Sequence, residues 1–231
     1  MCIRARGVAD LEDAAGEIHA KTGRTVLPVR ADMKNPGDIQ NLVSTTVSQL
    51  GGVDILVNNA VNSVAAPFME LADEDWLNHI NVKVMGYVRC SREVIPHMIQ
   101  RGGGRIINIG GMAARTAGPL TNSNGVTNSA VSNIAKNLSD QVAGDGILVN
   151  CIHPGTTRTP RLVGLLERQA GDANITLDEA ERRAAQGTPI GRLIEPEEVA
   201  HLVLFLVSDK ASAITGQTIG IEGGAGPGIH Y

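Results

Sequence analysis

The chain has 231 residues, of which 42% are hydrophobic and 19% charged, and its formal net charge is −4 at pH 7. These values are typical of one globular domain, and without a basic balance they argue against nucleic acid or an anionic membrane as a partner. Aromatic residues make up only 2% of the chain, which argues against stacking platforms for bases and predicts an aliphatic core.

The three cysteines, Cys2, Cys90 and Cys151, are too far apart to form a pair with metal-ligand or redox-motif spacing. Such sparse usage is typical of a reducing compartment, with the thiols serving as small buried hydrophobes. No apolar run approaches the length of a membrane span, and the N-terminus has no signal-peptide pattern. The sequence therefore predicts a cytoplasmic protein with no bound metal.

Helix-like and strand-like segments alternate along the chain. Helices are expected at 8–22, 35–47, 73–100, 124–143, 161–169, 177–185 and 195–209. Short apolar runs predict strands at 25–30, 54–60, 105–110, 147–155 and 217–224. Asn35 before Pro36 has the pattern of a helix N-cap, and Asp73 is expected to cap the next helix. Strands buried on both faces that alternate with helices favour one doubly wound, parallel α/β domain.

Several segments resemble, in order and spacing, the landmarks of the short-chain dehydrogenase/reductase family. They read DILVNNA, HINVKV, GRIINIG, LVNCIHPGTTRTP and GRLIEPEEVAHLVLFLVSDKASAITGQTIGIEGG. The resemblance covers essentially the whole chain and implies a Rossmann-like fold. Members of this family transfer a hydride between a nicotinamide cofactor and a carbonyl or alcohol. A fold alone does not fix the activity of a protein, however.

The resemblance also assigns catalytic positions. The family uses a tyrosine that supplies the proton and a lysine, one helical turn later, that lowers the pKa of the tyrosine. A serine binds the substrate oxygen, and an asparagine on the preceding long helix completes a proton relay. In this sequence the relay asparagine is matched to Asn81, while Gly111 replaces the serine. The tyrosine position is Asn124 and the lysine position is Asn128.

These replacements argue against ordinary carbonyl reduction. An amide does not titrate near neutral pH, and a positioned general acid supplies about 10²–10⁴-fold in rate. His153 is the one candidate in the cleft that titrates near neutral pH, and it stands where a strand ends in Pro154. We therefore take Asn81, Asn124, Asn128 and His153 as the candidate catalytic residues; the alternative for His153 is a structural role.

The N-terminal part of the family pattern is also incomplete. The family opens with a strand, a glycine-rich turn and a helix that together cradle the cofactor pyrophosphate. Here MCIRARG resembles the end of the second strand, and no Thr-Gly-x-x-x-Gly-x-Gly stretch occurs. We expect the first strand and the glycine-rich loop to be missing. The first two strands would then shift to close the sheet, or a partner would fill the gap, unless the gene product starts upstream.

Some positions resemble remnants of a nucleotide site. They are Arg4, Arg6, Asp32, Asn59 and Ala60. The two arginines stand where a 2′-phosphate would bind, and Asp32 resembles an adenine contact. Val61 replaces a glycine, and its branched side chain would crowd the cofactor. These residues are expected to be scaffold, so no cofactor is predicted, with NADP as the alternative.

The leading hypothesis from the sequence is a non-redox protein with a degenerate, cofactor-independent site. Residues 1–110 would be a degenerate nucleotide half, and residues 111–231 a substrate half with a lid at about 156–192. If the protein is an enzyme, it would catalyse a cyclisation, isomerisation, elimination or hydration of a small apolar molecule; otherwise it would bind one. Alternatives are a pseudoenzyme that pairs with an active homologue, and an NAD(P)-dependent oxidoreductase with a misassigned start. A homodimer or homotetramer built on the helices at 73–100 and 124–143 is expected.

Overall fold

The computed structural model describes residues 1–5, 7–226 and 228. The strands are β1 (Cys2–Ala5), β2 (Leu27–Arg30), β3 (Ile55–Asn58), β4 (Gly104–Ile109), β5 (Ile147–Pro154) and β6 (Thr218–Ile221). The α-helices are α1 (Val8–Thr22), α2 (Pro36–Leu50), α3 (Asp73–His79), α4 (Gly86–Gln100), α5 (Asn122–Val142), α6 (Pro160–Ala173), α7 (Leu177–Ala184) and α8 (Pro196–Val207). Shorter helical turns are η1 (Phe68–Glu70), the π-helix η2 (Ile80–Met85), η3 (Met112–Ala114), η4 (Ala143–Asp145) and η5 (Asp209–Ala211). The predicted alternation of strands and helices is confirmed.

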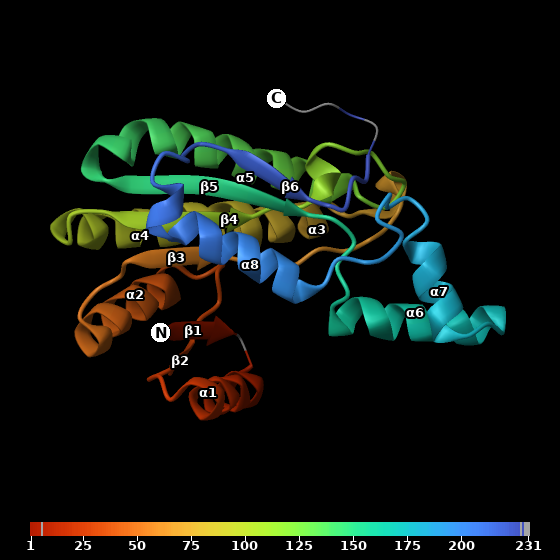
Figure 1. Ribbon diagram of the computed structural model, residues 1–231, viewed down its shortest axis with the longest axis horizontal. Coiled ribbons are helices and arrows are strands. Elements are labelled where there is room, and N and C mark those ends of the chain that lie inside the picture. Colours follow the sequence, from red (N-terminus) through yellow and green to blue (C-terminus); the bar gives the residue numbers. More distant parts are fainter. Residues whose placement is uncertain (6, 227, 229–231) are drawn as a thin grey trace.

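All strand pairing in the described part of the chain is parallel, but the strands form two separate sheets. β1 pairs with β2, and the second sheet has the order β3–β4–β5–β6. Figure 1 shows β1, β2 and α1 together on one side of the four-stranded sheet. A first strand is present at residues 2–5, so the expectation of a fold without one is not supported. Closure of one continuous sheet, one of the three alternatives considered from the sequence, does not occur, because β1 and β3 are not paired.

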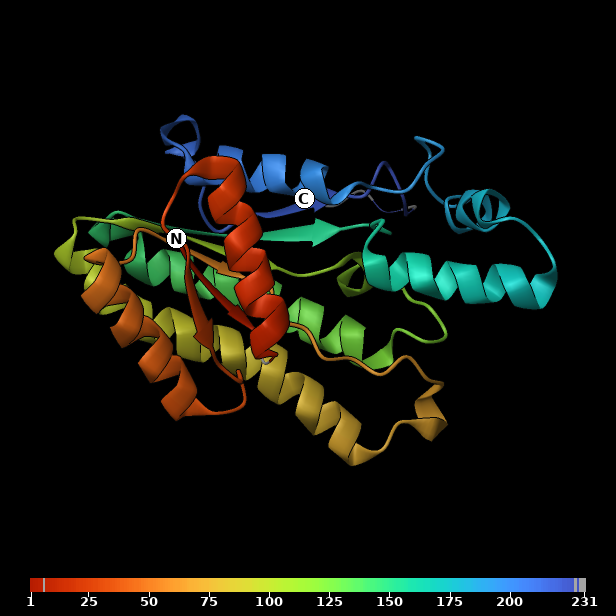
Figure 2. The same ribbon diagram turned by 90° about the horizontal axis from the view of Figure 1, so that it is seen from below.

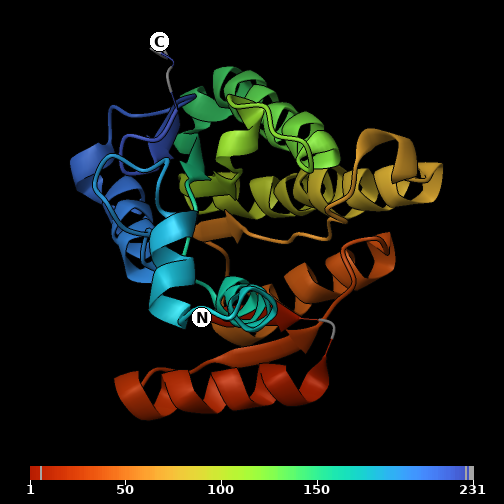
Figure 3. The ribbon, with the colours of Figure 1, turned by 90° about the vertical axis from the view of Figure 1, so that its right-hand side faces the viewer.

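Helices cover both faces of the four-stranded sheet, as the end view in Figure 3 shows. On one face, α2, α4 and α5 pack on the sheet through an aliphatic cluster that includes Val94, Met98, Ile106, Val131 and Val149. On the other face, Leu206 of α8 packs with residues such as Ile107 and Ile152 of the central strands. This layered arrangement is the doubly wound α/β architecture that the apolar strands predict.

The helix ends explain several boundaries. Asn35 caps α2 as predicted, because its Oδ1 accepts a hydrogen bond of 3.0 Å from the backbone N–H of Gly37. The cap assigned to Asp73 is wrong. Ala72 occupies the N-cap position of α3, and the Asp75 carboxylate accepts a hydrogen bond from the Ala72 N–H. The helix expected at 73–100 is interrupted by η2, in which the backbone is wound more widely than in an α-helix.

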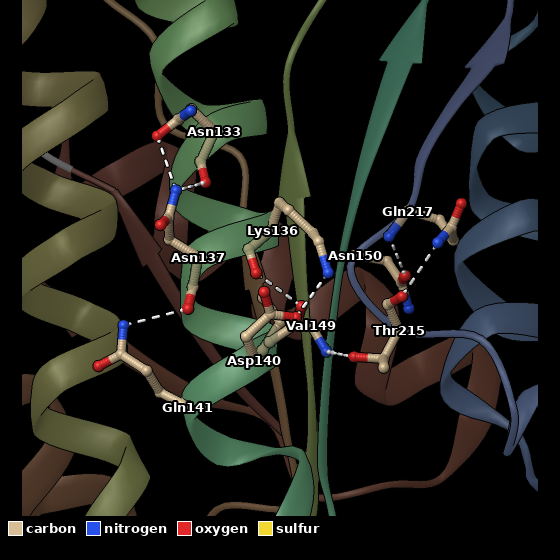
Figure 4. A network of polar contacts seen from close by, with 10 residues as sticks. Asn133, Lys136, Asn137, Asp140, Gln141, Val149, Asn150, Thr215 and Gln217 are labelled. Carbon is tan, nitrogen blue, oxygen red and sulfur yellow. Dashed lines mark hydrogen bonds and ion pairs between the residues drawn. The ribbon is translucent and has the colours of Figure 1, made fainter. Parts of the chain in front are cut away.

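Polar contacts anchor the end of the sheet that carries β6. Asn150 of β5 donates to Ile214 O at 2.8 Å and accepts from the Gln217 N–H at 3.0 Å. The Val149 N–H donates to the Thr215 hydroxyl at 3.0 Å, and Figure 4 shows these contacts beside α5. They fix the segment that leads into β6 and so position β6 for pairing with β5.

Helices α6 and α7 lie beyond the carboxyl ends of the strands, as Figures 1 and 2 show from two directions. They pack on each other through a small apolar cluster of their own, which includes Leu166, Ala170 and Ala180. An ion pair between Arg158 and Glu181, with N and O atoms 3.0 Å apart, joins the segment before α6 to α7. This pair of helices therefore stands beside the edge of the sheet where β3, β4 and β5 end.

Candidate active site

A cavity of about 620 Å³ lies at the carboxyl ends of β3, β4 and β5. Ligands of open α/β sheets bind at this edge. The lining residues come from the ends of β3, β4 and β5, from η2 and α5, from η3 and the segment after it, and from the residues after β6. They are Asn59, Val61, Lys83, Ile109–Ala113, Thr116, Ala117, Thr121, Asn124, Asn128, Pro154–Thr156, Ala225 and Gly226. Most of these side chains are small or apolar, so the few polar groups stand out.

Asn124 and Asn128 both line the cavity, one turn apart on α5. Asn128 is buried, and its Oδ1 has no hydrogen-bond partner among the described residues. Its Nδ2 lies against Gly111, because a Cβ atom built at Gly111 would be only 2.8 Å from Nδ2. The absence of a side chain at 111 therefore leaves the space that the Asn128 amide occupies.

His153 lies behind the cavity wall. Its Nδ1 accepts a hydrogen bond of 2.8 Å from the Gly111 N–H, and its Nε2 is 2.8 Å from the Ser132 hydroxyl. An accepting Nδ1 places the ring proton on Nε2, so the ring is neutral and donates to Ser132. The ring is almost completely buried, and a Cβ atom at Gly110 would overlap it. In this arrangement His153 holds the turn after β4 in place.

Asn81 does not share the cavity with Asn124 and Asn128. Its Oδ1 accepts a hydrogen bond of 2.8 Å from Arg89, whose guanidinium also donates to Met33 O. The assignment of the relay position to Asn81 thus places that side chain away from the other candidates. The residue of η2 that does reach the cavity is Lys83, two positions further on.

Lys83 was not singled out from the sequence. It is only 4% exposed, and its Nζ donates to Gly110 O at 3.2 Å. Burial removes water from the ammonium and lowers its pKa to about 8. Among the described residues that line the cavity, Lys83 is the one with a titratable side chain. Its spacing of four residues from both His79 and Tyr87 predicts a shared helix face, but the burial of that face is seen only in the structure.

His79 connects α3 to α5 next to the cavity. Its Nδ1 lies 3.0 Å from the Ser123 hydroxyl, and its Nε2 lies 3.3 Å from the Thr127 hydroxyl. Burial, and then the neighbouring charge of Lys83, lower the pKa of His79 to about 4. The imidazole is therefore neutral at physiological pH.

The predicted nucleotide contacts are distributed over two places. Asn59 lines the cavity together with Val61, and Ala60 is buried with its carbonyl accepting from the Tyr87 hydroxyl at 3.2 Å. Arg4 lies in β1, and the Asp32 side chain accepts from the Lys34 N–H at 2.9 Å just after β2. Arg6 lies outside the described residues. Asn59 therefore lies at the cavity, whereas Arg4 and Asp32 lie near the carboxyl ends of β1 and β2.

The described part of the chain contains no group of three or more His, Cys, Asp or Glu side chains arranged to hold a metal ion. None of its helices has both the length and the apolar character that crossing a membrane requires.

Comparison with known proteins identifies the family. Residues 3–226 match the family model described as enoyl-(acyl carrier protein) reductase. The chain is 32% identical over 215 residues to the 3-oxoacyl-[acyl-carrier-protein] reductase FabG of Thermotoga maritima, covering 93% of this chain and 82% of that protein. It is also 32% identical to the NADPH-dependent reductase BacG of Bacillus subtilis, covering 97% of this chain and 87% of that protein. The chain belongs to the short-chain dehydrogenase/reductase family.

Solved structures give the same result. The L-sorbose reductase of Gluconobacter frateurii, crystallised with NADPH and L-sorbose, superposes with a TM-score of 0.95 at 33% identity. The superposition covers 99% of this chain and 87% of the reductase chain.

These relatives correct three predictions made from the sequence. The non-redox function is wrong, as are the cofactor-independent, degenerate site and the absence of a cofactor. The relatives are reductases, and several of them are described as NADPH-dependent or were crystallised with NADPH. The prediction rested on the residue types at 111, 124 and 128, on the absence of the glycine-rich stretch and on Val61. It did not consider a charged group that reaches the cavity from another helix.

Proposed function

We propose that this protein is a nicotinamide-dependent oxidoreductase that interconverts a small carbonyl compound and the corresponding alcohol. The observation that carries the proposal is the cavity at the carboxyl ends of β3, β4 and β5, which Lys83 lines and where its Nζ donates to Gly110 O. An apolar pocket with a few convergent polar groups is the usual form of a small-molecule site. The relatives described above support reduction as the reaction class.

The cavity residues fit the nicotinamide end of such a cofactor. The buried Oδ1 of Asn128 lacks a donor within the described protein, and a ribose hydroxyl or a carboxamide N–H would supply one. Asn59 and the turn Pro154–Thr156 line the same cavity and would contact the nicotinamide ring. When bound, the reduced cofactor supplies a hydride. The residues described here bind and orient the reactants and keep water away from them.

We propose that the adenosine end of the cofactor lies along β1 and β2. Arg4 in β1 and Asp32 after β2 stand near the carboxyl ends of these strands, which supports this placement. We also propose that β1 corresponds to the second strand of the family and that the family's first strand belongs between β1 and β3. Two features support this: β1 and β3 are unpaired with each other, and Ile55 and Val57 of β3 are 47% and 43% exposed. A glycine-rich pyrophosphate loop would follow such a strand.

Further features of the sequence-based hypothesis remain proposals. We propose that residues 1–110 form the nucleotide half and residues 111–231 the substrate half of one domain, with α6 and α7 as the lid. Their position beside the strand ends and their separate small core support the lid assignment. We also propose a homodimer or homotetramer built on α4 and α5, where Ile99 and Val126 are exposed.

The test is direct titration of the full chain with NADPH and NADH by calorimetry, followed by reduction assays with a panel of small ketones and ketoses. We expect micromolar binding of one cofactor and carbonyl-dependent oxidation of it. Asn128→Leu should weaken cofactor binding several-fold, whereas Val126→Leu on the exposed face of the same helix should not. Absence of binding at millimolar concentrations of both cofactors would overturn the proposal.

A further inference from the structure

The proposed reaction needs a proton, and the residues at the expected positions cannot supply one. Gly111 has no side chain, and the amides of Asn124 and Asn128 do not titrate in the physiological range. His153 uses both ring nitrogens in hydrogen bonds to Gly111 and Ser132. His79 is likewise engaged, and it does not line the cavity.

We propose that Lys83 is the catalytic acid–base residue of this site. Its ammonium donates a proton to the carbonyl oxygen of the substrate during reduction, and its neutral amine accepts that proton during alcohol oxidation. The inference rests on the proposed function and adds to it the group that moves the proton.

The hydrogen bonds of Lys83 leave it capacity to bind substrate. An ammonium has three N–H donors. One of them is directed to Gly110 O, and the described residues provide no carboxylate within salt-bridge distance of Nζ. The remaining donors are available to an oxygen atom in the cavity, which both Lys83 and its partner Gly110 line. The bond to Gly110 O also fixes the side chain at the end of β4.

The surroundings of Lys83 favour proton exchange near neutral pH. Two titratable groups interact electrostatically with Lys83, namely His79 of α3 and Cys151 of β5. Tyr87 of α4 and His153 of β5 lie at the same end of β4, and Arg89 of α4 is bound to Asn81 of η2. Burial lowers the pKa of His79 and raises the pKa of Tyr87 and of Cys151, so these three groups are uncharged at pH 7. The facing side chains of α5, such as Asn128 and Thr127, are neutral. With its own pKa lowered to about 8, Lys83 is mostly protonated at pH 7 yet releases its proton readily.

The proton and electron balance is complete. In reduction, the carbonyl carbon gains the hydride of the reduced nicotinamide, and the carbonyl oxygen gains one proton from Nζ. The neutral amine of Lys83 then recovers a proton from water. In oxidation the same atoms move in reverse, so the oxidation rate depends on the fraction of neutral amine.

The first experiment compares Lys83→Met and Lys83→Arg with the parent chain and with Lys136→Met, an exposed residue of α5, as the control. We expect Lys83→Met to lower kcat for reduction by about 10²–10⁴-fold, with the Kd for NADPH within a few-fold of the parent value. For the parent chain, kcat/KM for reduction should fall as the pH rises through about 8, and that for oxidation should rise. Lys83→Arg keeps the charge but should lose this pH dependence, because guanidinium does not titrate there. Reduction by Lys83→Met at the parent rate would overturn the inference.

A second readout does not depend on activity. Competitive acetylation with acetic anhydride over a range of pH, read by peptide mass spectrometry, reports the titration of each lysine in the native chain. Lys83 should titrate near 8, below the usual lysine value of about 10.4, and hydroxyacetone with NADPH should protect it, whereas exposed Lys21 should stay unprotected. A midpoint near that usual value, or a Lys83 that the reagent does not reach, would overturn the inference.

The two readouts separate this inference from the proposed function. If the chain does not bind a nicotinamide cofactor, the proposed function is wrong, and acetylation still measures the pKa and the accessibility of Lys83. If the parent chain reduces carbonyl compounds and Lys83→Met does so equally well, the proposed function is supported and only the proposed role of Lys83 is wrong.

Discussion

The two sheets of this protein differ in how they are covered. In the four-stranded sheet, β4 and β5 are buried along most of their length, with α4 and α5 on one face and α8 on the other. In the two-stranded sheet, all four residues of β1 are only partly buried, and α1 packs on that pair. Because free energy of folding follows buried apolar area, most of it resides in the four-stranded part.

The difference also separates the two parts functionally. The cavity is built entirely from the four-stranded part and the segments that follow its strands. The β1–β2 pair contributes the proposed adenosine contacts, Arg4 and Asp32, but none of the cavity wall. A pair of strands without further neighbours is only marginally stable on its own. We therefore expect changes in β1 and β2 to affect cofactor binding more than the cavity.

The largest expected contrast comes from matched truncations in the two sheets. Ile107 of β4 is completely buried, so Ile107→Ala should lower the free energy of unfolding by about 2–5 kcal/mol. Ile3 of β1 is only half-buried, and Ile3→Ala should cost about 1 kcal/mol or less. Urea unfolding followed by circular dichroism measures both. Equal losses would show that the two sheets share one core, contrary to this comparison.

The sequence predicts the four-stranded part well, because long aliphatic runs and clear helix caps make element types obvious. The strand predicted at 105–110 is β4, which begins one residue earlier than predicted. The predicted N-cap Asn35 accepts the expected hydrogen bond from the Gly37 N–H. The separation of the two sheets was harder to predict, because pairing between distant strands leaves no local signal.

Two of the four candidate catalytic residues line the cavity, and Lys83, which also lines it, was not among the candidates. Asn124 and Asn128 share a face because residues four apart on a helix are neighbours, and both line the cavity. Asn81 was matched by residue type within HINVKV, but residues two apart point to nearly opposite sides of a helix. Lys83 is therefore the one that reaches the cavity. The space that Gly111 leaves for Asn128 is likewise visible only in three dimensions.

The next prediction concerns the cost of a buried charge in the four-stranded part. Lys83→Met should raise the free energy of unfolding at pH 7 by about 1–3 kcal/mol, because an ammonium without a carboxylate partner is removed from a desolvated position. The matched change Lys21→Met on exposed α1 should leave stability nearly unchanged. Thermal and urea unfolding at pH 7 measure both. A destabilised Lys83→Met variant would indicate that Lys83 is a structural residue, with its bond to Gly110 O worth more than its desolvation costs.

Acid should affect the four-stranded part through His79. The pKa of His79 in the fold, about 4, lies below its usual value of 6.5, so the unfolded chain takes up the proton first as the pH falls. The stability that neutral His79 contributes is present above pH 6.5 and is lost between 6.5 and 4. The loss should be on the order of 1–3 kcal/mol.

Unfolding curves at pH 7, 5.5 and 4.5 for the parent chain and His79→Gln check this effect. The variant should lose less stability across that range than the parent. His19→Gln, which changes an exposed residue of α1, should behave like the parent. A parent chain with equal stability at pH 7 and 4.5 would contradict the assignment of a buried neutral His79.

The smallest expected effect lies at the surface of the two-stranded part. Lys21 and Glu17 of α1 form an ion pair with N and O atoms 3.7 Å apart, and their side chains are 76% and 72% exposed. Exposed pairs four residues apart contribute about 0.3–0.5 kcal/mol, and salt screens them. Lys21→Ala should therefore change the urea midpoint only slightly, and the change should disappear in 1 M salt, at which the Debye length is roughly 3 Å. A larger loss that persists in salt would mean that α1 contacts more of the protein than β1 and β2. The marginal stability assigned to this part would then be too low.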